Sequence, residues 1–173
     1  MSGMKRESGR SGSGGGAGRP SNREVRRCAL QALYQFDVVE SADHELVRAS
    51  LAESPGSEAD HAGGFDLATM AWEFRDEADA IFAPMSPEWP AHRQPPIDRN
   101  LLRLAYYEMV VAAVPPRVVM NESVELAKEF GGERSPAFIN AMLDRMWKAR
   151  SASEAGSNAD ADAGLDTGSD GVR

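Results

Sequence analysis

The sequence predicts an all-α protein with one folded domain between two polar tails. Three observations support this: apolar residues recur at intervals of three and four, no segment alternates like a half-buried strand, and Gly and Pro clusters separate the periodic segments. We place the domain at residues 21–150 and the tails at residues 1–20 and 151–173. The Gly/Ser-rich first tail and the acidic second tail have almost nothing to bury, so we expect both to be disordered.

Three helices are expected in the first half of the domain. The first covers residues 22–39, where a capping-box spacing precedes apolar residues at helical intervals. A shorter one around residues 46–51 ends at a Ser-Pro-Gly turn. After Gly63-Gly64, interpreted as a break, residues 67–81 form an amphipathic helix that Pro84 stops.

A connector and three further helices follow. Residues 84–96 contain five prolines and predict an irregular connector. Residues 97–113 are apolar on nearly every side of the helical wheel, which is typical of a central helix buried by its neighbours. A helix over residues 117–130 is expected to close with a left-handed glycine at Gly131-Gly132, and Ser135 caps a last helix.

The net charge of −8 is distributed unevenly along the chain. Residues 1–27 hold seven Lys and Arg against two acidic residues, residues 28–150 hold eleven against twenty, and residues 151–173 hold one against five. A basic edge on an acidic body can bind phosphate locally while the remainder repels it. Any nucleic-acid binding should therefore be confined to that edge and should be sensitive to salt.

Several classes of function are disfavoured. No apolar run approaches the roughly eighteen residues of a membrane span and no secretory signal is visible, so we expect a cytoplasmic protein. The single cysteine, Cys28, lies in an apolar stripe and is interpreted as a buried structural thiol. The three histidines lie far apart with no cysteine at ligand spacing, so no metal site is expected. We predict no cofactor and no catalytic residue.

The first expected helix carries the best signal for binding. Arg23, Arg27, Gln31 and Tyr34 follow one ridge, so cations and a planar ring would share one surface. Single-stranded RNA is commonly held in this way. The alternative is that Arg26 and Arg27 are merely solvated and Tyr34 belongs to the core, and spacing alone leaves both open.

Two more positions stand out. Phe138 lies outside the apolar stripe of the last helix, beside Arg134 and a helix amino terminus, which favours a nucleotide platform as much as core packing. Glu108 lies on an apolar ridge, where an unpaired charge would be costly. We favour a structural ion pair or cap for Glu108 over catalysis, with no partner identified.

Three stretches resemble the NusB family, in matching order and at matching separation. They are RRCALQALYQFDV (26–38), IDRNLLRLAYYEM (97–109) and VPPRVVMNESVELAKEFGGERSPAFINAMLDRM (114–146), of which the last is the most specific. The resemblance implies two small helical bundles packed at a steep angle. It also implies transcription antitermination through boxA-type single-stranded RNA of ribosomal RNA operons, bound together with the small-subunit ribosomal protein NusE, within an RNA polymerase complex.

Positions carried over from the resemblance divide into two sides. The RNA side comprises Arg23, Arg26, Arg27, Tyr34, Arg134 and Phe138. The partner side comprises Asp98 and Glu108. A homodimer, a helical adaptor that binds only protein, and a domain related to the N-terminal region of ribosomal RNA cytosine methyltransferases stay open as alternatives. The last would need a large catalytic α/β domain that we do not expect after residue 150.

Overall fold

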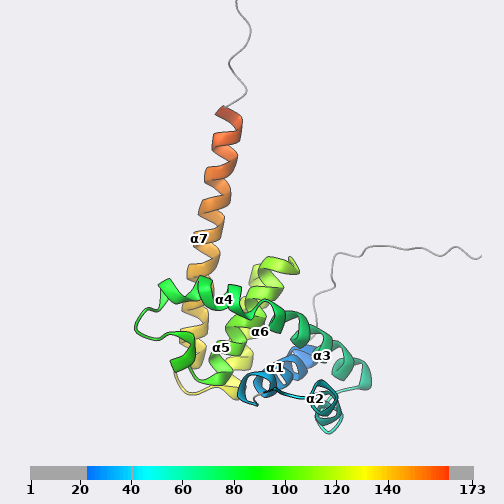
Figure 1. Cartoon of the computed structure of the whole chain (residues 1–173). Helices are drawn as coiled ribbons and strands as arrows, with labels where there is room; N and C mark the ends of the chain where they lie inside the picture. The colour runs from blue at the N-terminus through cyan, green and yellow to red at the C-terminus, as the bar shows by residue number, and fades with distance from the viewer. Residues whose placement is uncertain (1–22, 40, 164–173) are drawn as a thin grey trace, which may run out of the picture.

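The computed structural model describes residues 23–39 and 41–163, with side chains as far as Glu154, and all regular structure within them is helical (Figure 1). The α-helices are α1 (Arg23–Val38), α2 (His44–Leu51), α3 (Glu58–Glu73), α4 (Arg75–Phe82), α5 (Pro96–Tyr106), α6 (Pro116–Phe130) and α7 (Ser135–Ala163). Short turns complete the chain: the 3-10 turns η1 (Ala83–Met85) and η2 (Ala91–Arg93), and the π-helical turn η3 (Tyr107–Val111). The all-α prediction is confirmed for these residues.

Two helical bundles make up the body. Helices α1, α2 and α3 surround one apolar cluster, which includes Leu33, Phe36 and Phe65. Helices α4 to α7 surround a second cluster, which includes Phe82 and Leu143. In Figure 1, α6 and α7 run up the page while α1 and α3 cross it, so the two bundles meet at a steep angle.

Helix α5 is the element that the two bundles share. Leu104 belongs to the first cluster, whereas Leu101, Leu102 and Ala105 belong to the second. Residues apolar on nearly every side of a helix require neighbours on every side. The expected buried central helix is confirmed, although its last turn is the π-helical η3 rather than α-helix.

The predicted break at Gly63-Gly64 is wrong, because α3 begins earlier and runs through both glycines. Ser57 and Asp60 form the capping box that starts α3. Gly64 faces α1 so closely that a Cβ atom there would lie 2.3 Å from Cys28 Cβ. Gly64 therefore serves the close packing of two helices, which periodicity along one helix cannot reveal.

The predicted helix over residues 67–81 is two helices, α3 and α4, which meet at Phe74. The Arg75 guanidinium donates a hydrogen bond to the Trp72 carbonyl oxygen at 2.9 Å and lies over the Trp72 ring. This contact satisfies one of the carbonyl groups that the end of α3 leaves open.

The turn between α6 and α7 also differs from the prediction. Gly131 has φ −88°, so it is not the expected left-handed residue. A Cβ on Gly131 would lie 2.5 Å from Ser135 Cβ and 2.6 Å from the Ala127 carbonyl oxygen. A close approach of the two helix ends, rather than a positive φ, requires glycine here.

Helix α7 continues to Ala163, past residue 150 where we ended the domain, and projects from the body in Figure 1. An ion pair between Arg150 and Glu154, one turn apart at 3.0 Å, supports the start of this extension. The expectations for residues 1–20 and for residues 164–173 lie outside the described residues.

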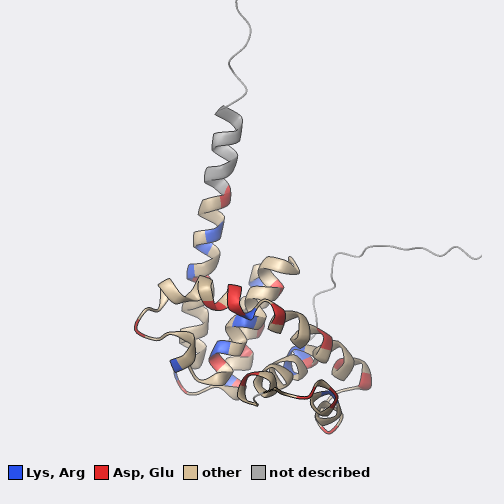
Figure 2. Ribbon diagram, in the orientation of Figure 1, with Lys and Arg blue, Asp and Glu red and all other residues tan. Residues whose placement is uncertain are grey.

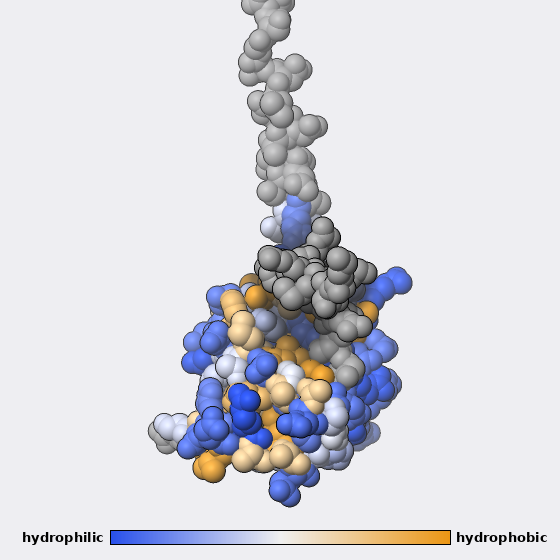
Figure 3. Space-filling view, turned by 90° about the vertical axis from the view of Figure 1, so that its right-hand side faces the viewer, coloured by the Kyte–Doolittle hydropathy of each residue, from blue (hydrophilic) through white to orange (hydrophobic). Residues whose placement is uncertain are grey.

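The surface mixes polar and apolar residues. On the face shown in Figure 3, hydrophobic residues gather in the middle and hydrophilic residues surround them. Exposed apolar side chains are normal in soluble proteins, so exposure alone identifies no site. None of the described helices is long and apolar enough to cross a bilayer.

Candidate nucleic-acid interface

Helix α1 has an inner and an outer face, and the predicted RNA-binding residues are divided between them. Arg26 points inward and is only 3% exposed. Arg23, Gln31 and Tyr34 are exposed and Arg27 is partly exposed, so these four form the outer face. A step of one residue turns the side chain about 100° around a helix axis, which is enough to separate adjacent arginines.

Arg26 forms a buried ion pair with Glu108, which is 2% exposed. Its Nε donates to Glu108 Oε2 at 2.9 Å, and its second terminal nitrogen lies 2.9 Å from Oε1. The expectations that Arg26 contacts RNA and that Glu108 contacts a partner are therefore corrected, because neither side chain reaches the surface. Their pairing is the structural role favoured for Glu108, with the partner now identified.

Arg23 lies at the edge of the body against α6. Its Nε and one terminal nitrogen donate to the two carboxylate oxygens of Glu122, both at 2.8 Å. The hydrogen bonds from Arg23 lower the pKa of Glu122 below its usual range, and the same contact raises the pKa of Arg23. A fork of two parallel N–H groups fits a phosphate as well as it fits a carboxylate.

Arg27 lies one turn further along the same face. It pairs with Glu24 on its own helix at 3.2 Å and with Glu129 near the end of α6. Its guanidinium also lies over the ring of Phe130, 5.7 Å from the ring centroid. Both outer arginines, Arg23 and Arg27, are therefore paired with carboxylates in this structure. An RNA phosphate would have to displace these carboxylates to bind the arginines.

A shallow apolar hollow of about 220 Å³ opens beside Arg27. It lies between α1, the start of α5 and the end of α6. Its lining consists of Arg27, Leu30, Gln31, Tyr34, Ile97 and Phe130. Tyr34 is 40% exposed, so the core position considered for it does not apply.

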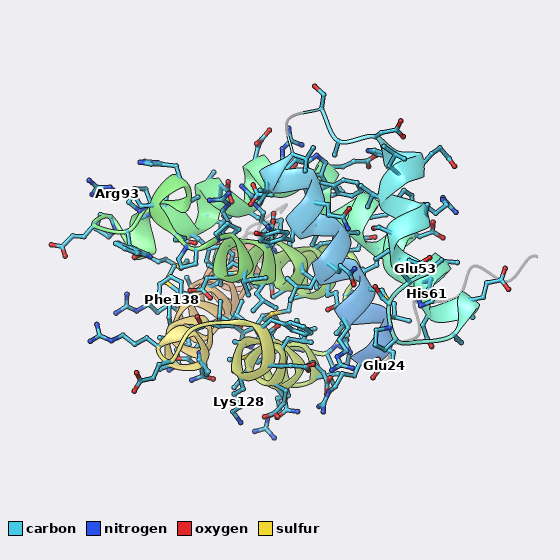
Figure 4. The ribbon with its side chains drawn as sticks, turned by 90° about the horizontal axis from the view of Figure 1, so that it is seen from below. Glu24, Glu53, His61, Arg93, Lys128 and Phe138 are labelled. Atoms are coloured by element: carbon cyan, nitrogen blue, oxygen red, sulfur yellow. The ribbon has the colours of Figure 1, made fainter. Side chains whose placement is uncertain are left out.

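A second hollow of about 690 Å³ lies on the other side of the start of α5. Phe138 and Arg134 line it together with Trp89 and Asp98. Phe138 is partly buried against the second core cluster and also lines this hollow, so core packing is observed and the nucleotide platform stays a prediction. In Figure 4, the labelled Phe138 and Glu24 lie on opposite sides of the end of α6.

Asp98 lies in the second hollow and is only 5% exposed. Burial raises the pKa of its carboxyl group, and a hydrogen bond with Ser135 lowers it in part. Ser135 Oγ also accepts the Gly132 N–H at 2.9 Å, so Asp98 supports the turn between α6 and α7. Among the described residues, Asp98 Oδ1 has no hydrogen-bond partner.

Charges on the described surface are mixed. Figure 2 shows Lys and Arg interspersed with Asp and Glu along the helices. No group of three or more metal-ligand side chains occurs in the described residues. Cys28 is buried, and burial raises its thiol pKa, which opposes a nucleophilic role.

Three residues of this region were missed by the sequence analysis: Phe130, Glu122 and Glu129. Glu122 and Glu129 are seven apart, a spacing that places both on one side of α6, and this signal was available. Phe130 is the last residue of α6, and its ring comes beneath Arg27 only because α1 and α6 both pack against α5.

Comparison with known proteins identifies the relatives of this chain. The NusB family model matches residues 23–148. The transcription antitermination protein NusB of Desulforapulum autotrophicum is 39% identical over 127 residues, which cover 72% of this chain and 89% of that protein. The NusB of Anaeromyxobacter dehalogenans is 40% identical over 125 residues, with coverage of 70% and 87%.

Solved structures share the fold. T. maritima NusB superimposes with a TM-score of 0.62 at 27% identity, covering 74% of this chain and 92% of that one. A complex described as the antitermination factors NusB and NusE with double-stranded RNA contains a chain that matches with a TM-score of 0.64 at 24% identity. That match covers 73% of this chain and 96% of the other, and at this identity it supports the fold alone.

Proposed function

This chain belongs to the NusB family of transcription antitermination proteins, and we propose that it binds boxA-type single-stranded RNA of ribosomal RNA operon transcripts together with NusE. The protein acts in the cytoplasm within an RNA polymerase complex and catalyses no reaction. The observation that carries the proposal is the outer face of α1, where two arginines, an amide and an exposed tyrosine follow one ridge.

The outer face supplies groups for both the phosphates and the bases of a single strand. Arg23 and Arg27 take phosphates in place of the Glu122 and Glu129 carboxylates, and this exchange limits the affinity for polyanions in general. Tyr34 offers a ring to an unpaired base. Arg134 and Phe138 extend the RNA surface across the end of α6. Arg26 is left out of this set because it is buried against Glu108.

Asp98 is the proposed contact for NusE. It is buried at the second hollow, and its Oδ1 has no hydrogen-bond partner in the described part of the chain. A donor from NusE that enters the hollow would hydrogen-bond Asp98 Oδ1, so this carboxylate offers NusE a polar contact at the floor of the hollow.

The test measures RNA binding with and without NusE at two salt concentrations, using a single strand and a duplex of the same sequence. We expect binding to the single strand to fall with salt. The double variant Arg23→Gln with Arg27→Gln should bind more weakly, and the slope of log affinity against log salt should shrink by about 0.7 for each phosphate that the variant no longer neutralises.

The matched control carries the same change of charge elsewhere. Arg48 lies on α2, and Arg117 lies at the start of α6, the end opposite Phe130. Their double Gln variant should keep the RNA affinity of the unchanged protein. An equal loss of RNA affinity in both double variants would mean that net charge, rather than the position of Arg23 and Arg27, causes the loss. If the protein with NusE binds no single strand even in dilute buffer, the proposal is overturned in favour of an adaptor that binds only protein.

A further inference from the structure

The hollow beside Arg27 contains an aromatic residue that neither the RNA nor the partner set includes. Phe130 is 44% exposed and belongs to neither apolar cluster. It faces the same hollow as Tyr34, the other exposed ring of the region. Two exposed rings that line one apolar hollow are a stronger sign of a ligand than either ring alone.

The rigidity of its surroundings defines the position of Phe130. It ends α6, and the next residue, Gly131, has no room for a side chain because Ser135 and the Ala127 carbonyl oxygen lie against it. From the other side, Glu24 and Glu129 hold the Arg27 guanidinium over the Phe130 ring. The Phe130 ring is therefore ordered before a ligand arrives, whereas Arg27 still has to leave Glu129 to meet a phosphate.

Resting on the proposed RNA binding, we propose that this hollow is a nucleobase pocket, in which one unpaired base of the RNA lies against Phe130 and Tyr34. The floor of Leu30 and Ile97 is apolar, so it accepts a flat ring after the water has left. The Arg27 guanidinium at the rim reaches the phosphate of the same nucleotide once it leaves Glu129.

Gln31 gives the pocket a polar contact. Ser54 Oγ donates to Gln31 Oε1 at 2.8 Å, so the carbonyl side of the amide is engaged by the chain itself. The amide nitrogen of Gln31 can donate to the base, and its oxygen keeps a second lone pair that can accept. Gln31 therefore offers the base a polar edge beside the two rings.

The size of the effect follows from base stacking. Loss of one aromatic platform costs about 1–3 kcal/mol per base, which is a fall of about 5- to 150-fold in affinity. We expect Phe130→Ala to weaken binding of the boxA-type single strand by this factor. Phe130→Tyr keeps the ring and should bind like the unchanged protein, whereas Phe130→Leu keeps an apolar side chain without a ring and should not.

An abasic scan of the RNA supplies the decisive measurement. Removing each base in turn should identify a position at which the unchanged protein loses affinity and the Phe130→Ala protein loses nothing further, since the base and ring are partners. Leu46→Ala, at an exposed apolar residue of α2, is the control and should leave the whole scan unchanged. Thermal melting of every variant verifies folding.

The outcomes separate this inference from the proposed function. If Phe130→Ala binds RNA as the unchanged protein does while the Arg23 and Arg27 variants lose affinity, the pocket is overturned and the RNA function stands. If Phe130→Ala loses binding to NusE but not to RNA alone, the ring is a protein contact and the pocket is again overturned. If the unchanged protein binds no RNA, the proposed function itself fails.

Discussion

Arg26 and Arg27 are neighbours in the chain and opposites in the fold. Arg26 lies on the inner face of α1, paired with Glu108 and shielded from water. Arg27 lies on the outer face, where its partners Glu24 and Glu129 are themselves partly exposed. The difference shows that a run of basic residues is not one functional unit, because the helix places each member in a different environment.

The energetic consequences differ as much as the surroundings. Removing one member of a buried ion pair leaves an uncompensated charge in the interior, which is strongly destabilising. An exposed ion pair contributes at most about 1 kcal/mol and is screened by salt. The inner face should therefore govern the stability of the protein, and the outer face should govern its affinity for RNA.

The greatest change should occur at Arg26. Arg26→Met should lower the free energy of unfolding by about 3–5 kcal/mol, because Glu108 is left as a buried unpaired charge. Urea denaturation followed by circular dichroism measures this. Replacing both partners, with Arg26→Met and Glu108→Leu together, should recover most of the loss. A stable Arg26→Met protein with weakened RNA binding would place Arg26 back on the RNA surface.

The second effect tests the packing of the inner face against α3. Gly64→Ala should cost about 1–3 kcal/mol of stability, because the new methyl group would lie 2.3 Å from Cys28 Cβ. Gly63→Ala is the matched control, since its nearest neighbours are Val25 methyl carbons at 3.6 Å. It should be neutral or stabilise α3 by up to about 1 kcal/mol. Equal thermal shifts in the two variants would contradict the close approach.

A smaller effect is expected on the outer face. Glu129→Gln releases Arg27 from a competing carboxylate, so RNA affinity should rise by up to about fivefold, in line with an exposed ion pair. Fluorescence anisotropy with labelled RNA at low salt would detect this. Asp144→Asn removes a comparable exposed carboxylate, one that pairs with Lys148 on α7, and should change nothing. Weaker binding by Glu129→Gln would show that phosphate does not replace the carboxylate.

The weakest effect is electrostatic. Arg23 lowers the pKa of Glu122, so their pairing stabilises the fold fully above the unfolded pKa of the carboxyl group, and this contribution disappears as pH falls through the lower, folded pKa. Carbon-13 NMR titration of Glu122 should show that pKa rising toward the usual value in Arg23→Gln. In the control variant Arg117→Gln, the pKa of Glu122 should stay low. A Glu122 pKa that is the same with and without Arg23 would mean that the ion pair does not persist in solution.

Much of the fold could be predicted because it depends on local patterns. Helical periodicity and Pro and Gly punctuation indicated α1, α2, α5, α6 and the start of α7 near their observed positions. Two of the errors arose where two helices touch: Gly63-Gly64 resembled a break, and Gly131 resembled a left-handed cap. In both cases glycine is needed because a Cβ atom at Gly64 or Gly131 would clash with a residue of a neighbouring helix. The sequence pattern within a single helix does not show such a contact.

Residues close together in the chain were enough to define the class of fold, the family and the ridge of polar and aromatic residues along α1. Three features became visible only once the helices were packed: Arg26 is buried against Glu108, Glu122 and Glu129 occupy the outer arginines, and Phe130 shares a hollow with Tyr34. These pairings join residues that lie far apart in the chain, and what fixes them is the packing of α1 and α6 against the shared helix α5.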